Sequence, residues 1–193
     1  MPLSAFSQFL TTFVRQQNAF QKQLGQWVAW GSLSLVLITA LVVILRYGFN
    51  MGSIALQESI MYNHAILFML GIAYTYEQDK HVRVDVFYGQ LDARKKAWVN
   101  FIGTIIFVLP VMAFIFWSGW EYVTTSWQIK EASGEAGGIA YLYMLKTLIV
   151  IMAGLVSLQA VSVLIQSVLT LFIKPEPVIE SDIETNIETE GKL

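Results

Sequence analysis

The chain has 193 residues, 55% of them hydrophobic and only 13% charged, and its mean hydropathy is +0.56, so a soluble globular protein is disfavoured and a membrane protein is predicted. Cysteine is absent, which excludes disulfides, iron–sulfur clusters, cysteine-type zinc sites and thiol nucleophiles. The net charge of −2 comes from an acidic C-terminal stretch, and the rest of the chain is mildly basic.

The first predicted element, over residues 1–22, is an amphipathic helix. Its apolar residues recur at helical spacing: Phe6, Phe9, Leu10, Phe13 and Val14. Because the opposite side carries Gln, Asn, Arg and Lys, we expect the helix to lie in the plane of the inner membrane interface. The alternative is that it extends the first membrane span toward the N-terminus.

The following residues, 23–173, are expected to form an all-α transmembrane domain of four helices. A helix needs about 20 predominantly apolar residues to cross a ~30 Å hydrocarbon layer. Runs of this kind predict spans at about 23–47, 54–76, 97–120 and 147–173. The second span is the most polar, because it contains Asn63 and His64 and must begin near Ile54, which brings Glu58 into it.

Two breaks are predicted in the second half of the domain. Pro110 lies in the middle of the third span, where it removes one backbone hydrogen bond and should bend the helix. Three glycines, Gly134, Gly137 and Gly138, should turn the loop before the last span after some helix near Trp127. Residues 174–193 hold six acids and two lysines, so they are expected to be a disordered acidic cytoplasmic tail.

Lys and Arg are retained on the cytoplasmic side of a membrane, and their distribution predicts the orientation. With four spans, the termini and the 77–96 loop carry nine of them, against three in the other two loops. Both termini are therefore expected inside, a topology written N-in/C-in. Tryptophans at the span ends should anchor the two interfaces: Trp27, Trp30 and Trp98 inside, and Trp117, Trp120 and Trp127 outside.

Charged residues near the spans are the first candidates for a functional role, because charge in hydrocarbon costs on the order of 3 kcal/mol. Arg46 ends the first span and Glu58 opens the second, so the two could pair with each other or with a partner subunit. The alternative is that both extend separately to water. Lys146, just before the fourth span, is expected to extend outward to water.

Polar residues within the spans form a second set. Gln159, Ser162 and Gln166 lie on one face of the fourth span and must face protein, either this chain's own bundle or a neighbour. His64 and Asn63 are expected to bond across the bundle. Because His81, the only other histidine, lies four to five helical turns of about 5.4 Å away, a bis-histidine haem is nearly excluded.

The segment HVRVDVF, residues 81–87, alternates valines with His81, Arg83 and Asp85 between two apolar runs. We interpret it as an extended or turning segment at the inner boundary, with a generic charged loop as the alternative. The remaining residues assemble no acid pair, catalytic triad, metal-ligand cluster or phosphate loop, so an enzyme is not expected. The mixed charges of the 77–96 loop also argue against nucleic-acid binding.

These features resemble the small membrane subunit of TRAP transporters, the tripartite ATP-independent periplasmic transporters of the DctQ-like family. The resemblance covers roughly residues 24–172. The residues and segments that carry it are Arg46, Glu58, the His81–Asp85 text, SWQIKEASGEAGG, YLYMLK and the Leu158–Gln159 pair.

The resemblance implies a bacterial or archaeal cytoplasmic (inner) membrane protein without a cofactor of its own. In such systems a periplasmic binding protein delivers an organic acid to a large multi-span permease subunit, which carries the acid together with sodium. The small subunit then braces the scaffold of the large one, and His81, Arg83 and Asp85 hold the inner turn or contact that partner. The alternatives are a haem- or quinone-bearing anchor of a respiratory enzyme and an independent four-span exporter.

Overall fold

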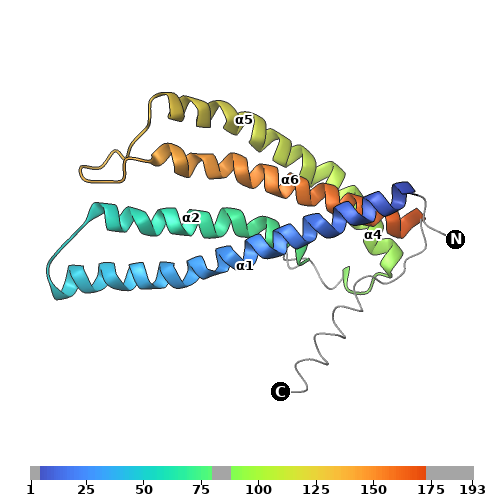
Figure 1. Cartoon of the computed structure of the whole chain (residues 1–193), viewed down its shortest axis with the longest axis horizontal. Coiled ribbons are helices and arrows are strands. Elements are labelled where there is room, and N and C mark those ends of the chain that lie inside the picture. Colours follow the sequence, from blue (N-terminus) through green and yellow to red (C-terminus); the bar gives the residue numbers. More distant parts are fainter. Residues whose placement is uncertain (1–4, 80–87, 173–193) are drawn as a thin grey trace, which may run out of the picture.

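The computed structural model describes residues 5–79 and 88–172, and over these ranges the chain is entirely helical (Figure 1). The predicted acidic tail and the site candidates His81, Arg83 and Asp85 lie outside the described residues. The helices are α1 (Ala5–Gly48), α2 (Ile54–Glu77), α4 (Ala93–Gly103), a π-helical turn η1 (Thr104–Val108), α5 (Leu109–Gln128) and α6 (Leu142–Phe172).

Helix α6 lies at the centre of the bundle. It contacts α1, α2, α4 and α5, while α1 pairs along α2 and α5 pairs along α6 (Figure 1). The buried positions of α6 include small residues, among them Ala153, Ala160, Ser162 and Ser167. Small side chains let helix backbones approach closely, which is how helices associate in lipid, where apolar burial gives little driving force.

Three stretches in the described part of the chain are long and apolar enough to cross a membrane: Ser7–Gly48, Ala93–Gln128 and Leu142–Phe172. They include the first, third and fourth spans that the sequence predicts. Helix α2 has 24 residues, or about 36 Å at 1.5 Å per residue, but it is not among the three. Its polar residues, including Glu58, Asn63 and His64, lower its hydropathy, so the fourth crossing and the topology remain predictions.

The separate in-plane helix predicted for residues 1–22 is not found. Helix α1 runs without a break for 44 residues, about 66 Å at 1.5 Å per residue. No Gly or Pro occurs between Ala5 and Leu24 to interrupt it, and Gln21, near the predicted boundary, is fully buried against α6. The alternative, an N-terminal extension of the first span, is the arrangement that the structure has from Ala5 onward.

Pro110 affects the third predicted span through a change of helix type. The π-helical turn η1 comes directly before α5, and the backbone N–H of Leu109 donates to the carbonyl of Thr104. Proline lacks an N–H and its ring crowds the carbonyl four residues earlier, so a wider turn at this point accommodates it. The buried Thr104 also shares a hydrogen bond with Tyr76 of α2, 3.0 Å between the two hydroxyl oxygens.

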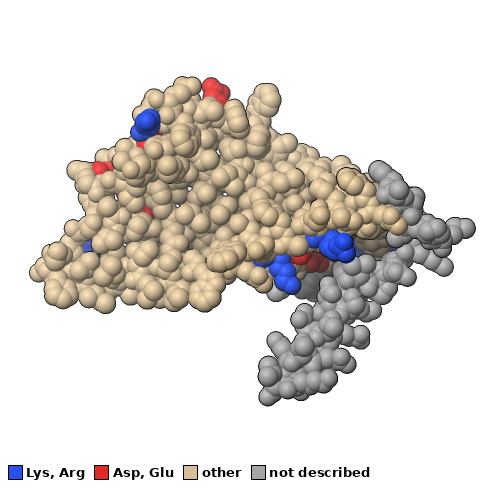
Figure 2. All heavy atoms as spheres, viewed as in Figure 1, with Lys and Arg blue, Asp and Glu red and all other residues tan. Residues whose placement is uncertain are grey.

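The surface is divided by charge. On the face that Figure 2 shows, the described Lys, Arg, Asp and Glu side chains form two groups, one on the left-hand part and one at the lower right, with an uncharged surface between them. Large apolar side chains are exposed on that surface, and Val36 and Leu37 of α1 are 64% and 60% exposed. Such a surface suits lipid or a protein partner and not water.

Candidate functional site

Glu58, on the second turn of α2, holds the loop between α5 and α6. Its carboxylate accepts hydrogen bonds from the Ser133 hydroxyl and, at 2.6 Å, from the backbone N–H of Ile139. The loop is closed on itself, because Ser133 N–H donates to the Ile139 carbonyl at 3.1 Å. One carboxylate therefore fastens both ends of a short loop to the start of α2.

Gly138 makes room for this contact. A Cβ added there would lie 2.4 Å from Ser133 Oγ and 2.8 Å from Glu58 Oε1. Neighbouring Gly137 has a φ of +83°, a backbone conformation that glycine adopts without strain. The glycines that predicted a turn here thus have two distinct roles, close packing at Gly138 and turn geometry at Gly137.

The predicted intramolecular pair between Arg46 and Glu58 is not formed. Glu58 is engaged by the loop, and Arg46 is exposed at the end of α1, beside Met51 and Gln57 in a shallow pocket of about 140 Å³. The sequence could not reveal this, because the partners of Glu58 are 75 and 81 residues further along the chain. The second possibility, that Arg46 pairs with a partner subunit, stays a prediction.

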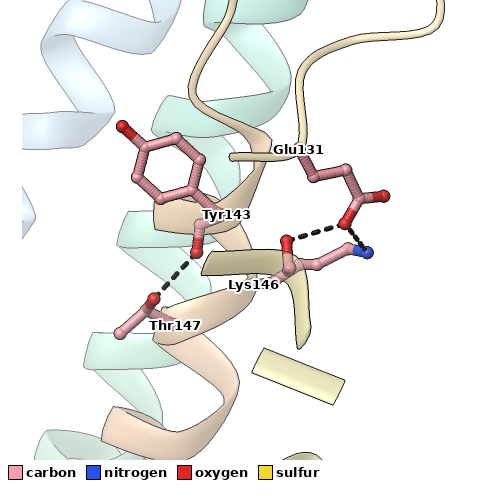
Figure 3. Close-up of polar contacts among 5 residues, drawn as sticks. Glu131, Tyr143, Lys146 and Thr147 are labelled. Carbon is pink, nitrogen blue, oxygen red and sulfur yellow. Dashed lines mark hydrogen bonds and ion pairs between the residues drawn. The ribbon is translucent and has the colours of Figure 1, made fainter. Parts of the chain in front are cut away.

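Lys146 was expected to extend to water, and in the structure it forms an ion pair with Glu131 instead (Figure 3). Lys146 Nζ lies 2.5 Å from Glu131 Oε2, and its side chain is only 14% exposed. The same ammonium group lies 4.0 Å from the centre of the Tyr122 ring, a cation–π contact. Lys146 therefore joins the start of α6 to the end of α5 and to the loop.

Glu131 is held by two donors. Ser126 Oγ donates to its Oε2 at 2.7 Å, and Lys146 donates to the same oxygen. Both bonds favour the ionised carboxylate, and with the bond from Lys146 contributing most they hold the pKa of Glu131 below its ordinary value of 4.5. The pair thus keeps its charges at neutral pH.

Trp127 bonds to the start of α6 next to this ion pair. Its indole N–H donates to Thr147 Oγ1 at 2.9 Å, and its ring meets Tyr143 edge to face at 4.6 Å between centroids. Thr147 in turn donates to the Tyr143 carbonyl at 2.8 Å, as Figure 3 shows. A groove of about 410 Å³ runs beside these residues over α5, open to the outside and lined by residues including Glu121, Tyr122 and Lys146.

All six predicted tryptophan anchors have exposed side chains. Their exposed fractions run from 44% at Trp98 to 84% at Trp117. Exposure is what an anchor at a membrane interface requires, although the depth of each ring in a bilayer remains a prediction. The full set is Trp27, Trp30, Trp98, Trp117, Trp120 and Trp127.

Two members of the polar stripe on α6 face this chain's own bundle. Gln159 Nε2 and Ser162 Oγ both donate to Asn18 Oδ1, at 3.1 Å and 3.0 Å. One turn earlier, the carbonyl of Leu155 accepts from Gln21 Nε2 at 3.2 Å. The question that the sequence left open is therefore answered for Gln159 and Ser162. Gln166 is half-buried, and its backbone carbonyl accepts from the Thr170 hydroxyl at 2.9 Å.

Asn18 and Gln21 are functional candidates that the sequence analysis missed. Asn18 and Gln21 belong to the polar side of the amphipathic N-terminal segment, and this pattern predicts that they face water. The polar residues Gln159 and Ser162 within α6 could have indicated these partners, since polar groups in an apolar span need a hydrogen-bond partner.

The other predicted cross-bundle contact is formed by Asn63 alone. Its Nδ2 donates to Ser34 Oγ at 2.5 Å and to the Gly31 carbonyl at 3.3 Å, which joins α2 to α1. His64 stacks on Phe68, with ring centroids 6.2 Å apart. Over residues 5–79 and 88–172, no group of three or more His, Asp or Glu is placed to hold a metal ion.

Comparison with known families identifies the chain. The family model described as tripartite ATP-independent periplasmic transporters, DctQ component, matches residues 35–170, well over half of the sequence. The chain belongs to this DctQ family. It is therefore a TRAP transporter small membrane subunit, a transporter component and not an enzyme.

The match includes both tethers of the α5–α6 loop, through Glu58 and through Lys146. It leaves out residues 1–34, so the α1 side of the Asn18 contact lies beyond the matched region. Neither the curated proteins nor the solved structures that were compared with the chain gave a match.

Proposed function

We propose that this chain is the small subunit of a sodium-coupled, binding-protein-dependent transporter for organic acids, and that it braces the scaffold of the large permease subunit. The family supplies the class of complex, a tripartite one whose other members are a large permease and a periplasmic binding protein. The finer assignments, namely the substrate class, the sodium coupling, the bracing role and the inner membrane location, are ours.

One observation supports placing the transport site in the large subunit and not in this chain: none of the buried side chains in the described part of the chain is charged. A carrier of carboxylates needs a cationic or strongly hydrogen-bonding site within the membrane to replace the water lost by the anion. The hydrogen bonds that the structure describes for these buried polar residues run to backbone carbonyls or to other side chains of this chain, such as Asn18 and Tyr76. The substrate and the sodium ions are therefore expected to bind the large subunit, and this chain is expected to have no cofactor.

The exposed surface supports a partner in the membrane. Within the apolar window of α1, which supplies the first predicted span, none of the residues is buried by the rest of the chain. Arg46 lies at the outer end of this helix without an ion pair among the described residues. An exposed apolar helix with a free guanidinium at its end can pack against a second subunit and place Arg46 beside one of its carboxylates.

Affinity purification tests the partnership. The tagged chain, coexpressed with its cognate large subunit in the native host, should copurify with it, and Arg46→Ala should reduce the yield of the complex. Arg94→Ala, which removes an exposed arginine at the other end of the bundle, is the matched control and should not reduce it. Equal yields from both variants would contradict the role of Arg46, and a stable solitary chain with a Soret band would contradict the whole proposal.

The proposed topology has four spans and both termini inside. Because the native chain has no cysteine, single cysteines can report it without further changes. Gly134→Cys in the outer loop should react with a membrane-impermeant maleimide in intact cells, and Gln90→Cys should react only after permeabilisation. Reaction at both positions in intact cells would mean that the α4–α5 segment between them does not cross. Reaction at Gln90→Cys with protection of Gly134→Cys would mean that α2 does not cross or that the orientation is inverted.

A further inference from the structure

The contact between α1 and α6 leaves several buried polar atoms without partners. Gln21 is fully buried and Gln159 is 1% exposed, yet Gln21 Oε1 and Gln159 Oε1 have no hydrogen-bond partner among the described residues. Gln17 Nε2, one turn before Gln21 on α1, is likewise buried and unpaired. A buried polar atom without a partner costs about 1–3 kcal/mol, so three at one contact need an explanation.

The three side chains come from adjacent turns of the contact between α1 and α6. The two helices run in opposite directions, because Gln21 reaches back to Leu155 while Asn18 meets Gln159 and Ser162. Gln17 and Gln21 are one turn apart on one face of α1, and Leu155 and Gln159 are one turn apart on the facing side of α6. Gln159, which bonds to Asn18, therefore lies across from the stretch of α1 that carries Gln17 and Gln21.

The orientation of the Gln21 amide is fixed by chemistry. Its hydrogen-bond partner is a backbone carbonyl, which can only accept, so the nitrogen must face Leu155 and the oxygen must face away. Gln159 uses its nitrogen on Asn18 Oδ1, an oxygen that also accepts from Ser162. The unpaired set is therefore one amide nitrogen that can donate, from Gln17, and two carbonyl oxygens that can accept.

This set is the complement of one water molecule. Water has two O–H donors for Gln21 Oε1 and Gln159 Oε1, and its oxygen can accept from Gln17 Nε2. Buried waters typically make about three hydrogen bonds to polar groups that would otherwise be unsatisfied. The side chains of Gln21 and Gln159 are 0% and 1% exposed, so a lipid headgroup or a partner side chain has no access to their unpaired oxygens, whereas a small water molecule can lie between them.

We infer that a structural water molecule binds between α1 and α6, held by Gln17, Gln21 and Gln159. It continues the direct bonds made by Asn18 and so fastens the N-terminal part of α1 to the central helix. The inference concerns how this subunit is held together, and it does not depend on which substrate the transporter carries.

Nuclear magnetic resonance tests the water directly. The full chain, with ¹⁵N-labelled glutamine and reconstituted in lipid nanodiscs, should show a cross peak from the Gln17 side-chain amide to water, with the sign of a long-lived contact. Gln17→Met assigns that peak by removing it, and the exposed Gln16 should show only the short-lived contact of surface water. Absence of a long-lived cross peak at Gln17 would overturn the inference.

The melting temperature gives a second test, because Gln17→Met should change it in opposite directions with and without a bound water. If water bridges the three residues, Gln17→Met removes one of its bonds and lowers the melting temperature, while the matched variant Gln16→Met leaves it unchanged. If no water is bound, Gln17→Met removes an unpaired buried donor, so the melting temperature rises or stays the same. Either of the latter results would overturn the inference.

Discussion

Gly25 of α1 packs directly against the ring of Tyr74 on α2, so Gly25→Ala should destabilise the α1–α2 pair. An added Cβ would lie 2.1, 2.5 and 2.6 Å from three carbons of Tyr74, including its Cβ. Because an ordinary carbon contact is about 3.5 Å, the helices would have to separate by about 1.4 Å or Tyr74 would have to leave its position. The Tyr74 atoms involved lie close to its backbone, so a small rotation of the ring tip cannot relieve the overlap.

The magnitude follows from two opposing terms. Overpacking of this kind costs about 1–3 kcal/mol, and replacing a mid-helix glycine by alanine returns about 0.5–1 kcal/mol. We therefore expect Gly25→Ala to lower the free energy of unfolding by about 1–2 kcal/mol. Gly71→Ala, on α2, is the matched control: nothing lies within 4 Å of its added Cβ, so only the helix propensity changes and stability should rise.

The assay is the fraction of purified protein that remains monodisperse in mild detergent after heating, measured over a temperature series. Gly25→Ala should lose this fraction at a lower temperature than the wild type, and Gly71→Ala at the same or a higher one. Adding Tyr74→Ala to Gly25→Ala should recover only part of the loss, because it removes the ring carbons at 2.1 and 2.5 Å but leaves the Tyr74 Cβ at 2.6 Å. A Gly25→Ala protein as stable as Gly71→Ala would refute the close packing of α1 on α2.

Three further predictions concern the polar contacts. Asn18→Leu should lower the free energy of unfolding by about 1–3 kcal/mol in the same heating assay, because it strands the buried donors of Gln159 and Ser162, whereas Gln16→Leu at an exposed position should not. Gly138→Ala should speed proteolytic cleavage of the 129–141 loop by displacing Ser133 from Glu58, and Gly134→Ala, which meets no atom within 4 Å, should leave the rate unchanged; equal rates would argue against the tether. The pKa of Glu131 is lowered in the folded protein, so ionised Glu131 stabilises the fold above pH 4.5, and this stabilisation is lost as the pH falls through the pKa of the folded state. The wild type should therefore lose more thermal stability on acidification than Glu131→Gln. Parallel pH profiles of the two proteins would contradict the ion pair.

The helical architecture could be predicted from the sequence because long uncharged runs have few other stable forms. The apolar stretches ending near Arg46, around Pro110 and before the acidic tail each correspond to a helix. The continuity of α1 was harder to predict. An amphipathic segment without Gly or Pro can either bend at an interface or continue straight, and only its packing against α6 decides between the two.

The polar contacts could be predicted only in part, because their partners are distant in the chain. A charge at the end of a span signals a need for a partner but does not name it. Glu58 is bonded by the loop 75 and 81 residues later, and Gln159 by a residue 141 positions earlier. Local spacing therefore indicates that Glu58 and Gln159 need partners, but it assigns the wrong partner to Glu58 and misses the pairing of Lys146 with Glu131.

Uptake by reconstituted vesicles tests the central claim most directly. The cognate large subunit is placed in proteoliposomes with and without this chain, the substrate-loaded binding protein is added outside, and carboxylate uptake is followed under an inward sodium gradient. The proposed function predicts sodium-dependent uptake only when both membrane subunits are present, and none from this chain alone. Equal uptake by the large subunit without this chain, or transport by this chain on its own, would contradict it.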